Sequence, residues 1–573
     1  MAAADAVLDD ATLAELHRRA VADVCAAGPF ATTAEPVLGV PMEVFAERHR
    51  SLRQLFDAVV DRQGPLGAVT IDGATTARDE LRRSVDLVAA GLAARHGIGP
   101  GDRVAILAAN CREWIEAFWA VTSLGGVVCA CNGWWTTDEI DRALADLEPR
   151  LLIGDARRLE RVGAPPPGCT VYAIESDWAS LRHSGERAGG PPTPVAVDED
   201  DPALVLFTSG TTGAPRGAVI SHRGLVGFVQ VNLCNGAVRA RRAVLEAEAR
   251  GVDPATVPAP APPAPHVTLV TSPMFHVSGL FGAVLMGFAT GARLVLRRGR
   301  FDPLDVLALI EREGVTNWSP IGSTGPRVIH HPDFARFDVS TVRQIGFGGG
   351  PTSPARRAEV QAAFPNVEQN LATGYGSTET VASVVSNAGA DYERHPSSVG
   401  RPNPTCRVEI WDADDAPLPD GELGRIVVQS PYGIFGYWRD ADATAAVVRR
   451  DRFVDTGDFG RIVDGMVTLD ARARDLIIRS GENVSPIEVE ACLDAHPAVA
   501  ECAVIGVDHP LHGQEVAAVV VPVDGGVALD TDDLAAHCAA TLAPYKVPTV
   551  WVVRREPLPR NAAGKVLKRE LSA

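Results

Sequence analysis

A glycine-rich loop at residues 208–217 contains the densest set of groups that could bind an anion. It reads TSGTTGAPRG and directly follows an apolar segment at 203–207 that predicts a buried strand. The glycines let backbone N–H groups turn toward an anion, the hydroxyls add donors, and Arg216 adds positive charge. No GK[ST] sequence closes the loop, so it is not a Walker A motif. We predict that it holds the phosphates of a nucleotide.

A tyrosine further along the chain offers a platform for the base of that nucleotide. Tyr375 stands between Gly374 and Gly376, and its flat ring could stack on adenine. The turn at Gly350 and Pro351 carries no bulky side chain, so its backbone can approach the opposite face of the base. A core position is the alternative for a tyrosine in this context.

Two carboxylates suit the remaining parts of a nucleotide. Glu379 lies in a polar loop, where it suits Mg²⁺, a hard ion that keeps several waters and bridges phosphates. Asp458 follows a Thr-Gly turn and is placed to accept hydrogen bonds from both ribose hydroxyls. Capping of the turn is the alternative role for Asp458.

The loop and these residues together resemble the adenylate-forming superfamily, which includes acyl-CoA synthetases, adenylation domains of peptide synthetases, and luciferases. Motifs similar to those of the family follow one another in order, and the resemblance covers residues 52–571. They are PMFHVSG (273–279), GGGP (348–351), GYGSTET (374–380), TGD (456–458), RARD (472–475), GEN (481–483) and PRNAAGK (559–565).

The resemblance implies two half-reactions in one active site. A carboxylic acid and ATP give an acyl-adenylate and pyrophosphate, and after rotation of the small domain a thiol, most simply that of free coenzyme A, takes the acyl group. The expected co-substrates and cofactor are ATP, coenzyme A and Mg²⁺, with Thr208 and Glu379 on the metal side. The nucleotide-binding residues are Thr208, Ser209, Gly210, Thr211, Thr212, Gly213, Arg216, Gly350, Pro351, Gly374, Tyr375, Gly376, Thr378, Glu379, Asp458, Arg472 and Arg474, and those of the coenzyme A tunnel are Ser480, Gly481 and Glu482.

Lys565 is the predicted catalytic cation. Attack of a carboxylate on the α-phosphate brings two anions together, and a cation that bridges their oxygens lowers the barrier. Of 54 basic residues only Lys546, Lys565 and Lys568 are lysines, so a lysine at this position indicates a need for a compact ammonium group. Solvation of a terminal helix by the basic tail is the alternative. The same bias accounts for Arg216, where the family usually has lysine.

His276 is the second predicted catalytic residue and bears on the choice of acid. Amino-acid-activating relatives have an aspartate at this position to meet the α-ammonium group, so a histidine favours an unsubstituted carboxylic acid. A core histidine is the alternative. The expected pocket wall is mostly apolar or small and suits a fatty, aryl or terpenoid acid. It comprises Phe281, Trp318, Ser319, Gly322, Phe347, Gly349 and Thr373.

The elements that position these residues follow an α/β rhythm. Helical patterns at 76–95, 114–124 and 137–147 alternate with apolar strands at 104–107 and 151–153, which indicates a parallel sheet. A second such region follows from 203 to about 386 and contains an insertion at 237–265. Short strands at 398–469 indicate a small β subdomain.

We therefore expect an α/β fold: a large N-terminal domain of two parallel α/β subdomains and a small β subdomain, then a small, mobile α+β C-terminal domain. The predicted boundaries are an N-terminal extension at 1–50, an AMP-binding domain at 51–470, a hinge at 471–475 and a C-terminal domain at 476–573.

Composition limits the partners. A net charge of -18 argues against nucleic acid and anionic lipid. The N-terminus has no basic region typical of a signal peptide, and no apolar stretch is long enough for a membrane span, so we expect a cytoplasmic protein. A homodimer is left open. A separate carrier protein in place of coenzyme A and a catalytically silent nucleotide-binding module are the alternative functions.

Overall fold

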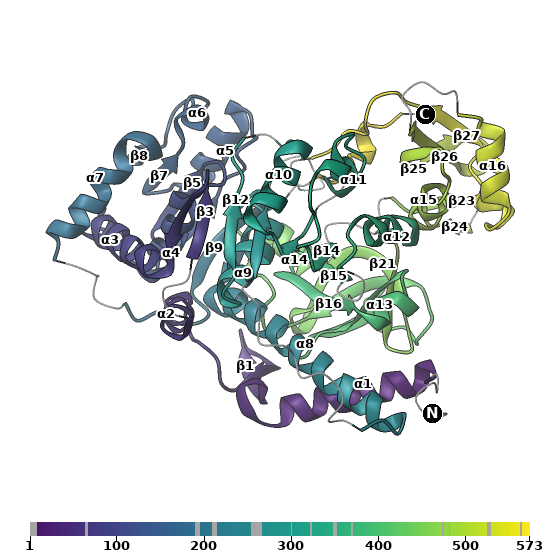
Figure 1. Cartoon of the computed structure of the whole chain (residues 1–573), viewed down its shortest axis with the longest axis horizontal. Coiled ribbons are helices and arrows are strands. Elements are labelled where there is room, and N and C mark those ends of the chain that lie inside the picture. The colour runs from purple at the N-terminus through teal and green to yellow at the C-terminus, as the bar shows by residue number, and fades with distance from the viewer. Residues whose placement is uncertain are drawn as a thin grey trace.

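The computed structural model describes residues 8–63, 67–189, 195–208, 215–253, 266–299, 301–320, 324–347, 352–367, 371–472, 475–480, 482–523, 529–561 and 564–572. Within these ranges the chain forms two large sheets covered by helices, and a small C-terminal domain at the upper right of Figure 1. The predicted α/β fold, with a large N-terminal and a small C-terminal domain, is confirmed.

The first sheet contains seven strands among the described residues, in the order β20-β10-β9-β6-β5-β7-β8. The strands from β9 to β8 run parallel, and β10 runs antiparallel to both of its neighbours. The apolar residues of the inner strands β5, β6 and β7 are buried, as expected of parallel strands with helices on both faces. The strands are β5 (Arg103–Leu107), β6 (Val127–Ala130), β7 (Leu151–Gly154), β8 (Thr170–Ala173), β9 (Pro202–Thr208), β10 (Arg216–Ser221) and β20 (Gly436–Tyr437); the helices are α3 (Arg78–His96), α4 (Arg112–Ser123), α5 (Thr137–Leu147), α6 (Ala156–Leu159) and α7 (Ile174–Arg187).

The second sheet has thirteen strands within the described ranges and joins two regions that the sequence had separated. Its strands run parallel from β3 to β15 and antiparallel beyond, so the expected small β subdomain continues the same sheet. In order they are β18 (Arg407–Trp411), β19 (Gly424–Gln429), β21 (Val454–Val463), β22 (Met466–Arg472), β17 (Ser398–Pro402), β16 (Ala382–Ala388), β15 (Leu371–Ser377), β14 (Gln344–Phe347), β13 (Asn317–Trp318), β11 (Val267–Val270), β12 (Arg293–Leu296), β3 (Gly67–Ile71) and β4 (Ala74–Ala77).

Helices of this second region lie around the sheet and carry part of the site. The apolar stretch that begins at Ser278 forms a π-helix, η3 (Ser278–Leu285), that continues into α9 (Met286–Ala289). The π form is rare and occurs often at functional sites. The other helices are α2 (Leu52–Gln63), α10 (Pro303–Glu313), α11 (Thr324–Ile329), α12 (Pro354–Ala363), α13 (Ala390–Arg394) and α14 (Ala441–Val447).

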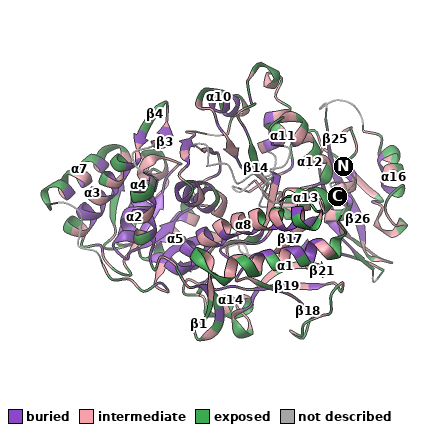
Figure 2. Ribbon diagram, turned by 60° about the horizontal axis from the view of Figure 1, so that its bottom comes forward, coloured by how far each residue is buried: buried purple, intermediate pink, exposed green. Residues whose placement is uncertain are grey.

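A long helix, α8 (His222–Ala249), connects the two sheets and packs against the N-terminal extension. Its N-cap is Ser221, as the sequence predicts, whose hydroxyl accepts from the Gly224 N–H at 3.1 Å. Helix α1 (Asp10–Ala26) lies along α8 in Figures 1 and 2, and the Asp23 carboxylate pairs with Arg241 at 2.7 Å. A hairpin of β1 (Thr32–Val37) and β2 (Val40–Phe45) completes the extension.

The main hydrophobic core lies between the first sheet and its helices, where Figure 2 shows mostly buried residues. Aromatic rings dominate it: Phe56 stacks on Phe288 at a centroid distance of 5.1 Å and also packs on Trp119. Cys129 and Cys131 are both buried in a second cluster on the other side of this sheet. None of the described helices is long and apolar enough to cross a membrane.

The C-terminal domain has its own sheet and core. The order is β24-β23-β26-β25, with β27 parallel to β26. Buried valines and leucines fill the space between this sheet and its two helices. The elements are β23 (Ile477–Arg479), β24 (Glu482–Val484), α15 (Pro486–Asp494), β25 (Val499–His509), β26 (Gly513–Pro522), α16 (Thr531–Ala539) and β27 (Val550–Val553).

Candidate functional site

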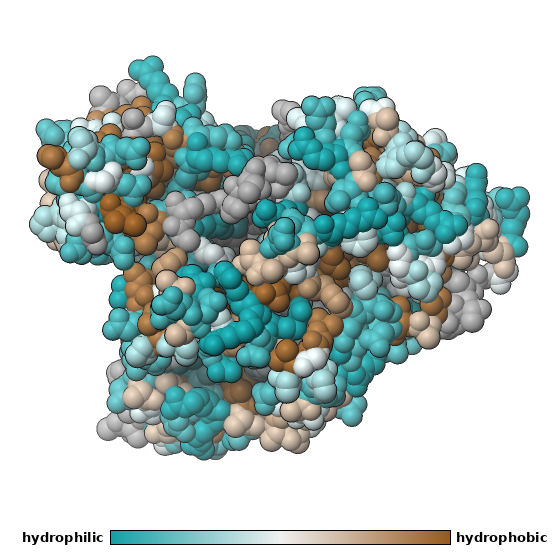
Figure 3. Space-filling view, turned by 180° about the vertical axis from the view of Figure 1, so that it is seen from behind, coloured by the Kyte–Doolittle hydropathy of each residue, from teal (hydrophilic) through white to brown (hydrophobic). Residues whose placement is uncertain are grey.

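A large cleft, with a volume of about 2410 Å³, lies between the second sheet, α8 and the C-terminal domain. Figure 3 shows the C-terminal domain as a lobe at the upper left, beside a hollow in this face of the molecule. Residues from most of the predicted motifs line the cleft. They are Thr208, Arg216, His276, Gly374, Tyr375, Gly376, Thr378, Glu379, Asp458, Arg472 and Lys565.

Some predicted site residues lie outside the described residues. They are Ser209, Gly210, Thr211, Thr212, Gly213, Gly350, Pro351, Arg474 and Gly481. The strands that flank the phosphate loop, β9 and β10, are described and pair antiparallel, with Thr208 opposite Arg216. The two ends of the loop therefore lie side by side at the edge of the cleft.

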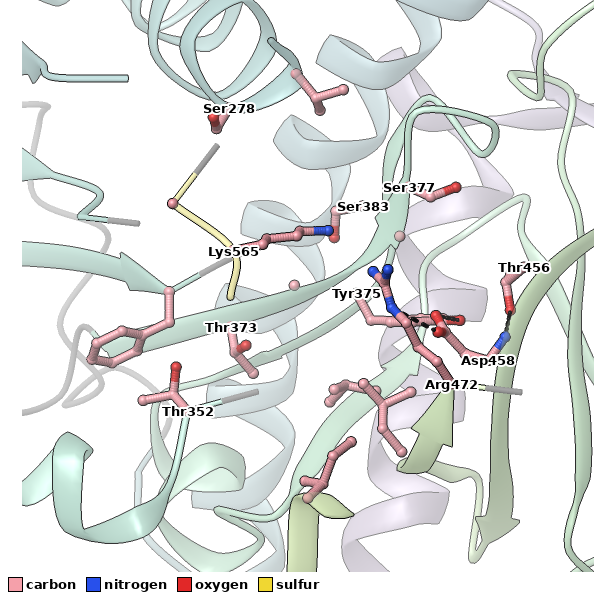
Figure 4. A pocket seen from close by; sticks show the side chains of 18 of the residues that line it. Ser278, Thr352, Thr373, Tyr375, Ser377, Ser383, Thr456, Asp458, Arg472 and Lys565 are labelled. Atoms are coloured by element: carbon pink, nitrogen blue, oxygen red, sulfur yellow. Dashed lines mark hydrogen bonds and ion pairs between the residues drawn. The ribbon is translucent and has the colours of Figure 1, made fainter. Parts of the chain in front are cut away.

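Tyr375 and Asp458 form one hydrogen-bonded pair in the cleft (Figure 4). The Tyr375 hydroxyl donates to Asp458 Oδ2 at 2.9 Å, and Arg472 Nε lies 3.6 Å from Asp458 Oδ1. Arg472 stands directly opposite Asp458 on the neighbouring strand, β22, which explains this proximity. Asp458 lines the cleft, and its two oxygens have different neighbours: Oδ2 accepts from Tyr375, and Oδ1 lies near Arg472.

The pKa of Asp458 depends on two opposing influences, its burial and the positive or hydrogen-bonding groups beside it. Burial raises the pKa of Asp458, whereas Arg472, the hydrogen bond from Tyr375 and the charge of Lys565 lower it. All three neighbours stabilise the carboxylate form, which is the form that accepts hydrogen bonds from two hydroxyls. The influence of Lys565 also shows that its ammonium group lies within electrostatic range of this carboxylate.

Glu379 is held by a tyrosine that the sequence did not indicate. The Tyr437 hydroxyl donates to Glu379 Oε1 at 2.7 Å, and the Thr208 side chain also hydrogen-bonds to Tyr437. Burial and the Glu379 charge raise the pKa of Tyr437, so the phenol stays protonated and keeps donating. The Arg216 guanidinium lies 5.8 Å from the ring centroid of Tyr437 and pairs with Asp440 at 3.3 Å.

These contacts fit a magnesium ion on the phosphate side of the cleft. A carboxylate and a hydroxyl, from Glu379 and Thr208, are oxygen ligands of the kind that Mg²⁺ takes alongside water and phosphate. Tyr437 orients the carboxylate by occupying one of its oxygens. The Gly436-Tyr437 dipeptide repeats the Gly374-Tyr375 pattern, but nothing local in the sequence indicates that its partner is Glu379.

Lys565 is presented to the cleft by a tight turn. The Lys565 N–H donates to Asn561 Oδ1 at 3.0 Å, and the Asn561 N–H donates to the Lys565 carbonyl at 2.9 Å. Gly564 has a φ of +75°, a left-handed conformation that glycine adopts without strain. Figure 4 shows the Lys565 side chain extending toward Ser383 on β16. The turn therefore directs a cation from the C-terminal domain into a cleft of the large domain.

His276 is a neutral hydrogen-bond donor at the start of η3. Burial, with a further contribution from Lys565, lowers the pKa of His276 to about 4. The Ser278 N–H donates to His276 Nδ1 at 3.4 Å, and the Ser278 hydroxyl lies 3.0 Å from the same atom. Because Nδ1 accepts, the neutral ring carries its proton on Nε2. The ring lines the cleft, where this N–H is a donor for an oxygen of a ligand.

The two described residues of the predicted thiol tunnel lie away from the cleft. Ser480 and Glu482 are exposed at the turn between β23 and β24, and neither contributes to the lining, in contrast to Lys565. The Ser480 hydroxyl pairs with His512 Nδ1 at 2.7 Å, and Ser480 has a φ of +53°. This left-handed backbone is uncommon for residues other than glycine.

Contacts between the two domains hold this orientation. The Arg356 guanidinium, on α12, donates to the Ala500 carbonyl and lies 3.7 Å from Asp494 on α15. The Ser485 hydroxyl donates to the Asp470 carbonyl across the expected hinge. These polar contacts favour the arrangement in which Lys565 faces the cleft.

The wall expected for the acid is only partly as predicted. Trp318, Ser319, Phe347 and Thr373 line the cleft. Phe281 does not: it is fully buried and packs on Phe228 at a centroid distance of 5.5 Å. Gly322 and Gly349 lie outside the described residues. Sequence reasoning missed a whole face of α8, which contributes Phe228, Asn232, Leu233, Asn235, Gly236 and Arg239.

Comparison with known proteins identifies the class that this fold and site define. The model of the AMP-binding enzyme family matches residues 56–438, and that of the AMP-binding enzyme C-terminal domain matches residues 488–565. The chain belongs to the family of AMP-binding enzymes, in agreement with the resemblance seen in its motifs.

Individual relatives cover nearly the whole chain. A feruloyl-CoA synthase from an Amycolatopsis species is 33% identical over 505 residues, which are 88% of this chain and 95% of that protein. The fatty acid–[acyl-carrier-protein] ligase ScoC of Streptomyces coeruleorubidus is 31% identical over 511 residues, 88% of this chain and 92% of that protein. The crystal structure of ATP-bound MatB from Rhodopseudomonas palustris superimposes with a TM-score of 0.76 at 29% identity, covering 90% of this chain and 97% of that chain.

Proposed function

We propose that the protein is an AMP-forming acyl-CoA synthetase. It activates a carboxylic acid with ATP to an acyl-adenylate and pyrophosphate, and then transfers the acyl group to the thiol of coenzyme A. The observation that carries this proposal is the convergence of Lys565, Asp458 and Glu379 in one cleft, although they come from three distant parts of the chain. Relatives named as acid–CoA ligases support it.

The nucleotide takes the end of the cleft near Tyr375 in this proposal. Asp458, already oriented by Tyr375, accepts the ribose hydroxyls, and the tyrosine ring bounds the base. We expect the sequence between β9 and β10 to bind the β- and γ-phosphates through backbone N–H groups, and Arg216 adds charge at its end. Glu379 and Thr208 hold Mg²⁺, which supplies charge neutralisation to the phosphates.

Adenylation is an in-line attack of the substrate carboxylate on the α-phosphate. Lys565 places an ammonium group where the charges of the two anions meet, which stabilises the transition state. The Nε2–H of His276 donates to the carboxylate and orients it, and its low pKa of about 4 keeps the ring neutral at physiological pH. Both residues contact the reacting groups in this arrangement, so we propose them as the catalytic residues.

Thioester formation requires another arrangement of the domains. Ser480, Gly481 and Glu482 reach the cleft only if the C-terminal domain turns about residues 471–475, which also withdraws Lys565. The contacts of Arg356 with Ala500 and Asp494 are polar and few, as expected of an interface that opens in every cycle. The observed orientation is therefore the one for adenylation.

The substrate is a carboxylic acid without an α-amino group. No aspartate stands at position 276 to meet an ammonium group, and the lining near Trp318 and Phe347 is apolar. An acidic surface disfavours nucleic acid as a partner. A cytoplasmic location and a homodimer stay predictions.

The test is product analysis with ATP, Mg²⁺, coenzyme A and a panel of carboxylic acids. We expect AMP, pyrophosphate and an acyl-CoA; ADP and phosphate would contradict the proposal. ATP binding without pyrophosphate exchange for any acid would instead indicate a silent nucleotide-binding module.

A carrier protein is the second candidate acceptor, because the relative ScoC is named as a ligase for an acyl carrier protein. In that case acyl-adenylate would accumulate with coenzyme A and be discharged when a phosphopantetheinylated carrier protein is added. Intact-protein mass spectrometry of the carrier distinguishes the two acceptors.

A further inference from the structure

The face of α8 that lines the cleft carries two nitrogen donors that the proposed reaction does not use. Asn235 Nδ2 is buried and has no hydrogen-bond partner in the described part of the chain. Arg239 follows four residues later, so both side chains lie on the same face of the helix, one turn apart. Both line the cleft.

The Arg239 guanidinium lies close to Gly236, which stands about one turn earlier on the same helix. A Cβ placed on Gly236 would lie 4.0 Å from Arg239 Nη2, so the side chain folds back along the helix toward Asn235. The side chain is exposed to the cleft but surrounded by protein, and the resulting desolvation lowers the pKa of Arg239. No acidic group among the described residues opposes this shift.

The other arginines of α8 each form an ion pair with a carboxylate, in contrast to Arg239 on the cleft side. Arg223 pairs with Asp200 at 2.5 Å, Arg241 with Asp23 at 2.7 Å, and Arg242 with Glu246 at 2.8 Å. Arg239 makes no ion pair within the described ranges. A desolvated cation and a buried amide without partners are both costly, and a bound anion would satisfy them together.

We infer that Asn235 and Arg239 form a binding site for a second carboxylate, and that the substrate acid is a dicarboxylic acid with an apolar body. The guanidinium offers two parallel N–H donors to a carboxylate and the amide adds a third. The inference rests on the proposed function, since the first carboxylate is the one that reacts near His276 and Lys565.

The distance along the cleft leaves room for the apolar body. Residues 228 and 239 are both in the lining, and at a rise of 1.5 Å per residue they lie about 16 Å apart along the axis of α8. Phe228 lies on this face, and Leu233 of α8 and Met286 of α9 also line the cleft. A hydrocarbon or aryl body fits such a surface, whereas its far end meets the polar pair.

The test compares matched acids on matched variants. Straight-chain dicarboxylic acids of increasing length are each paired with the monocarboxylic acid of the same length, and kcat and KM are measured from pyrophosphate release. The variants are Arg239→Met, Asn235→Leu and Arg239→Lys, with Arg241→Gln as the control because it changes an arginine on the outer side of the same helix.

We expect the wild type to prefer the dicarboxylic acid at one length. Arg239→Met should raise KM for that acid about tenfold to a hundredfold, the value of a hydrogen-bonded ion pair, and leave kcat and the monocarboxylic acid nearly unchanged. Asn235→Leu should show a smaller loss and Arg239→Lys a partial recovery, since lysine keeps the charge but not the fork. Arg241→Gln should keep the wild-type preference.

Two outcomes would overturn the inference: a wild-type preference for the monocarboxylic acid at every length, or an unchanged preference in Arg239→Met. Calorimetric titration of each acid into wild type and Arg239→Met separates this result from the proposed function. Weaker binding of the dicarboxylic acid to the variant, without pyrophosphate release from any acid, would support the subsite and contradict the synthetase. If pyrophosphate is released but wild type and Arg239→Met bind both acids equally well, the synthetase activity is supported and the second-carboxylate subsite is contradicted.

Discussion

The nucleotide end and the acid end of the cleft organise their polar side chains in opposite ways. At the nucleotide end the functional carboxylates are held by protein donors: Tyr375 donates to Asp458, and Tyr437 donates to Glu379. At the acid end two donors on α8, Asn235 Nδ2 and the Arg239 guanidinium, have no partner among the described residues. A ligand common to a family is met by groups oriented in advance, whereas a ligand that differs between members is met by groups whose hydrogen bonds are left for it.

The largest expected effect concerns Lys565, which acts where the two ends meet. Lys565→Ala should lower acyl-adenylate formation about a hundredfold to a thousandfold, because it removes preorganised charge from the transition state. Thioester formation from a supplied acyl-adenylate should change little. Pre-steady-state measurement of each half-reaction checks this, with Arg555→Ala, an exposed position in the same domain, as the control. Equal losses in both steps would contradict the assigned role.

A smaller effect is expected from substitution of Tyr437, which tests whether the Glu379 carboxylate must be oriented by a protein donor before the nucleotide binds. Tyr437→Phe removes the donor to Glu379 Oε1 and should reduce pyrophosphate release about tenfold at limiting Mg²⁺. Activity should recover as Mg²⁺ is raised, because the ion can then orient the carboxylate itself. Tyr172→Phe, at a tyrosine that hydrogen-bonds His96 and is not among the lining residues, is the control. If Tyr437→Phe has the same Mg²⁺ dependence as the wild type, Glu379 does not need the hydrogen bond from the Tyr437 hydroxyl.

The smallest effect is expected from pH at the acid end. Histidine ordinarily titrates near 6.5, and burial lowers the pKa of His276 to about 4. The ring therefore stays neutral as pH falls from about 7.5 to 5.5, and kcat/KM for the acid should show no step that depends on His276 in this range. The pH profiles of wild type and His276→Asn should differ in height but run parallel. A step in kcat/KM near pH 6.5 that is present in the wild type and absent from His276→Asn would show that the pKa of His276 is not lowered by burial.

The lowered pKa of His276 also makes the free energy of unfolding depend on pH. Because its folded-state pKa is depressed, protonation of His276 favours the unfolded chain. Its contribution to the free energy of unfolding is complete above pH 6.5 and is lost as pH falls toward 4.

Local motifs allowed much of the nucleotide end to be predicted from the sequence. Asp458, Tyr375 and Glu379 each stand beside glycine turns whose type and order were recognisable, and the structure places all three in the cleft. Tyr437 was missed because its partner Glu379 lies 58 residues away, and only the pairing of β20 with β10 brings them together. Long-range pairing leaves no local signature.

The acid end was predicted less well for reasons of helix geometry. Phe281 was expected in the pocket wall, but the π-helical hydrogen bonding of η3 widens the turn and changes which residues face inward. On α8 the helical period shows that Asn235 and Arg239 share a face, but not that this face meets the cleft. That orientation depends on how the helix packs against the sheet and against α1, which is a tertiary property.

The opposition of Asp458 and Arg472 on β21 and β22 has a mechanical consequence. Arg472 is the last residue of β22, and the Asp475 N–H donates to the Arg472 carbonyl at 2.9 Å. In the proposed reaction, the partner of the ribose-binding carboxylate is thus also part of the predicted hinge at residues 471–475. In the proposed cycle, binding of the ribose by Asp458 would therefore act on this hinge through a single cross-strand contact, which would couple the bound nucleotide to the position of the small domain.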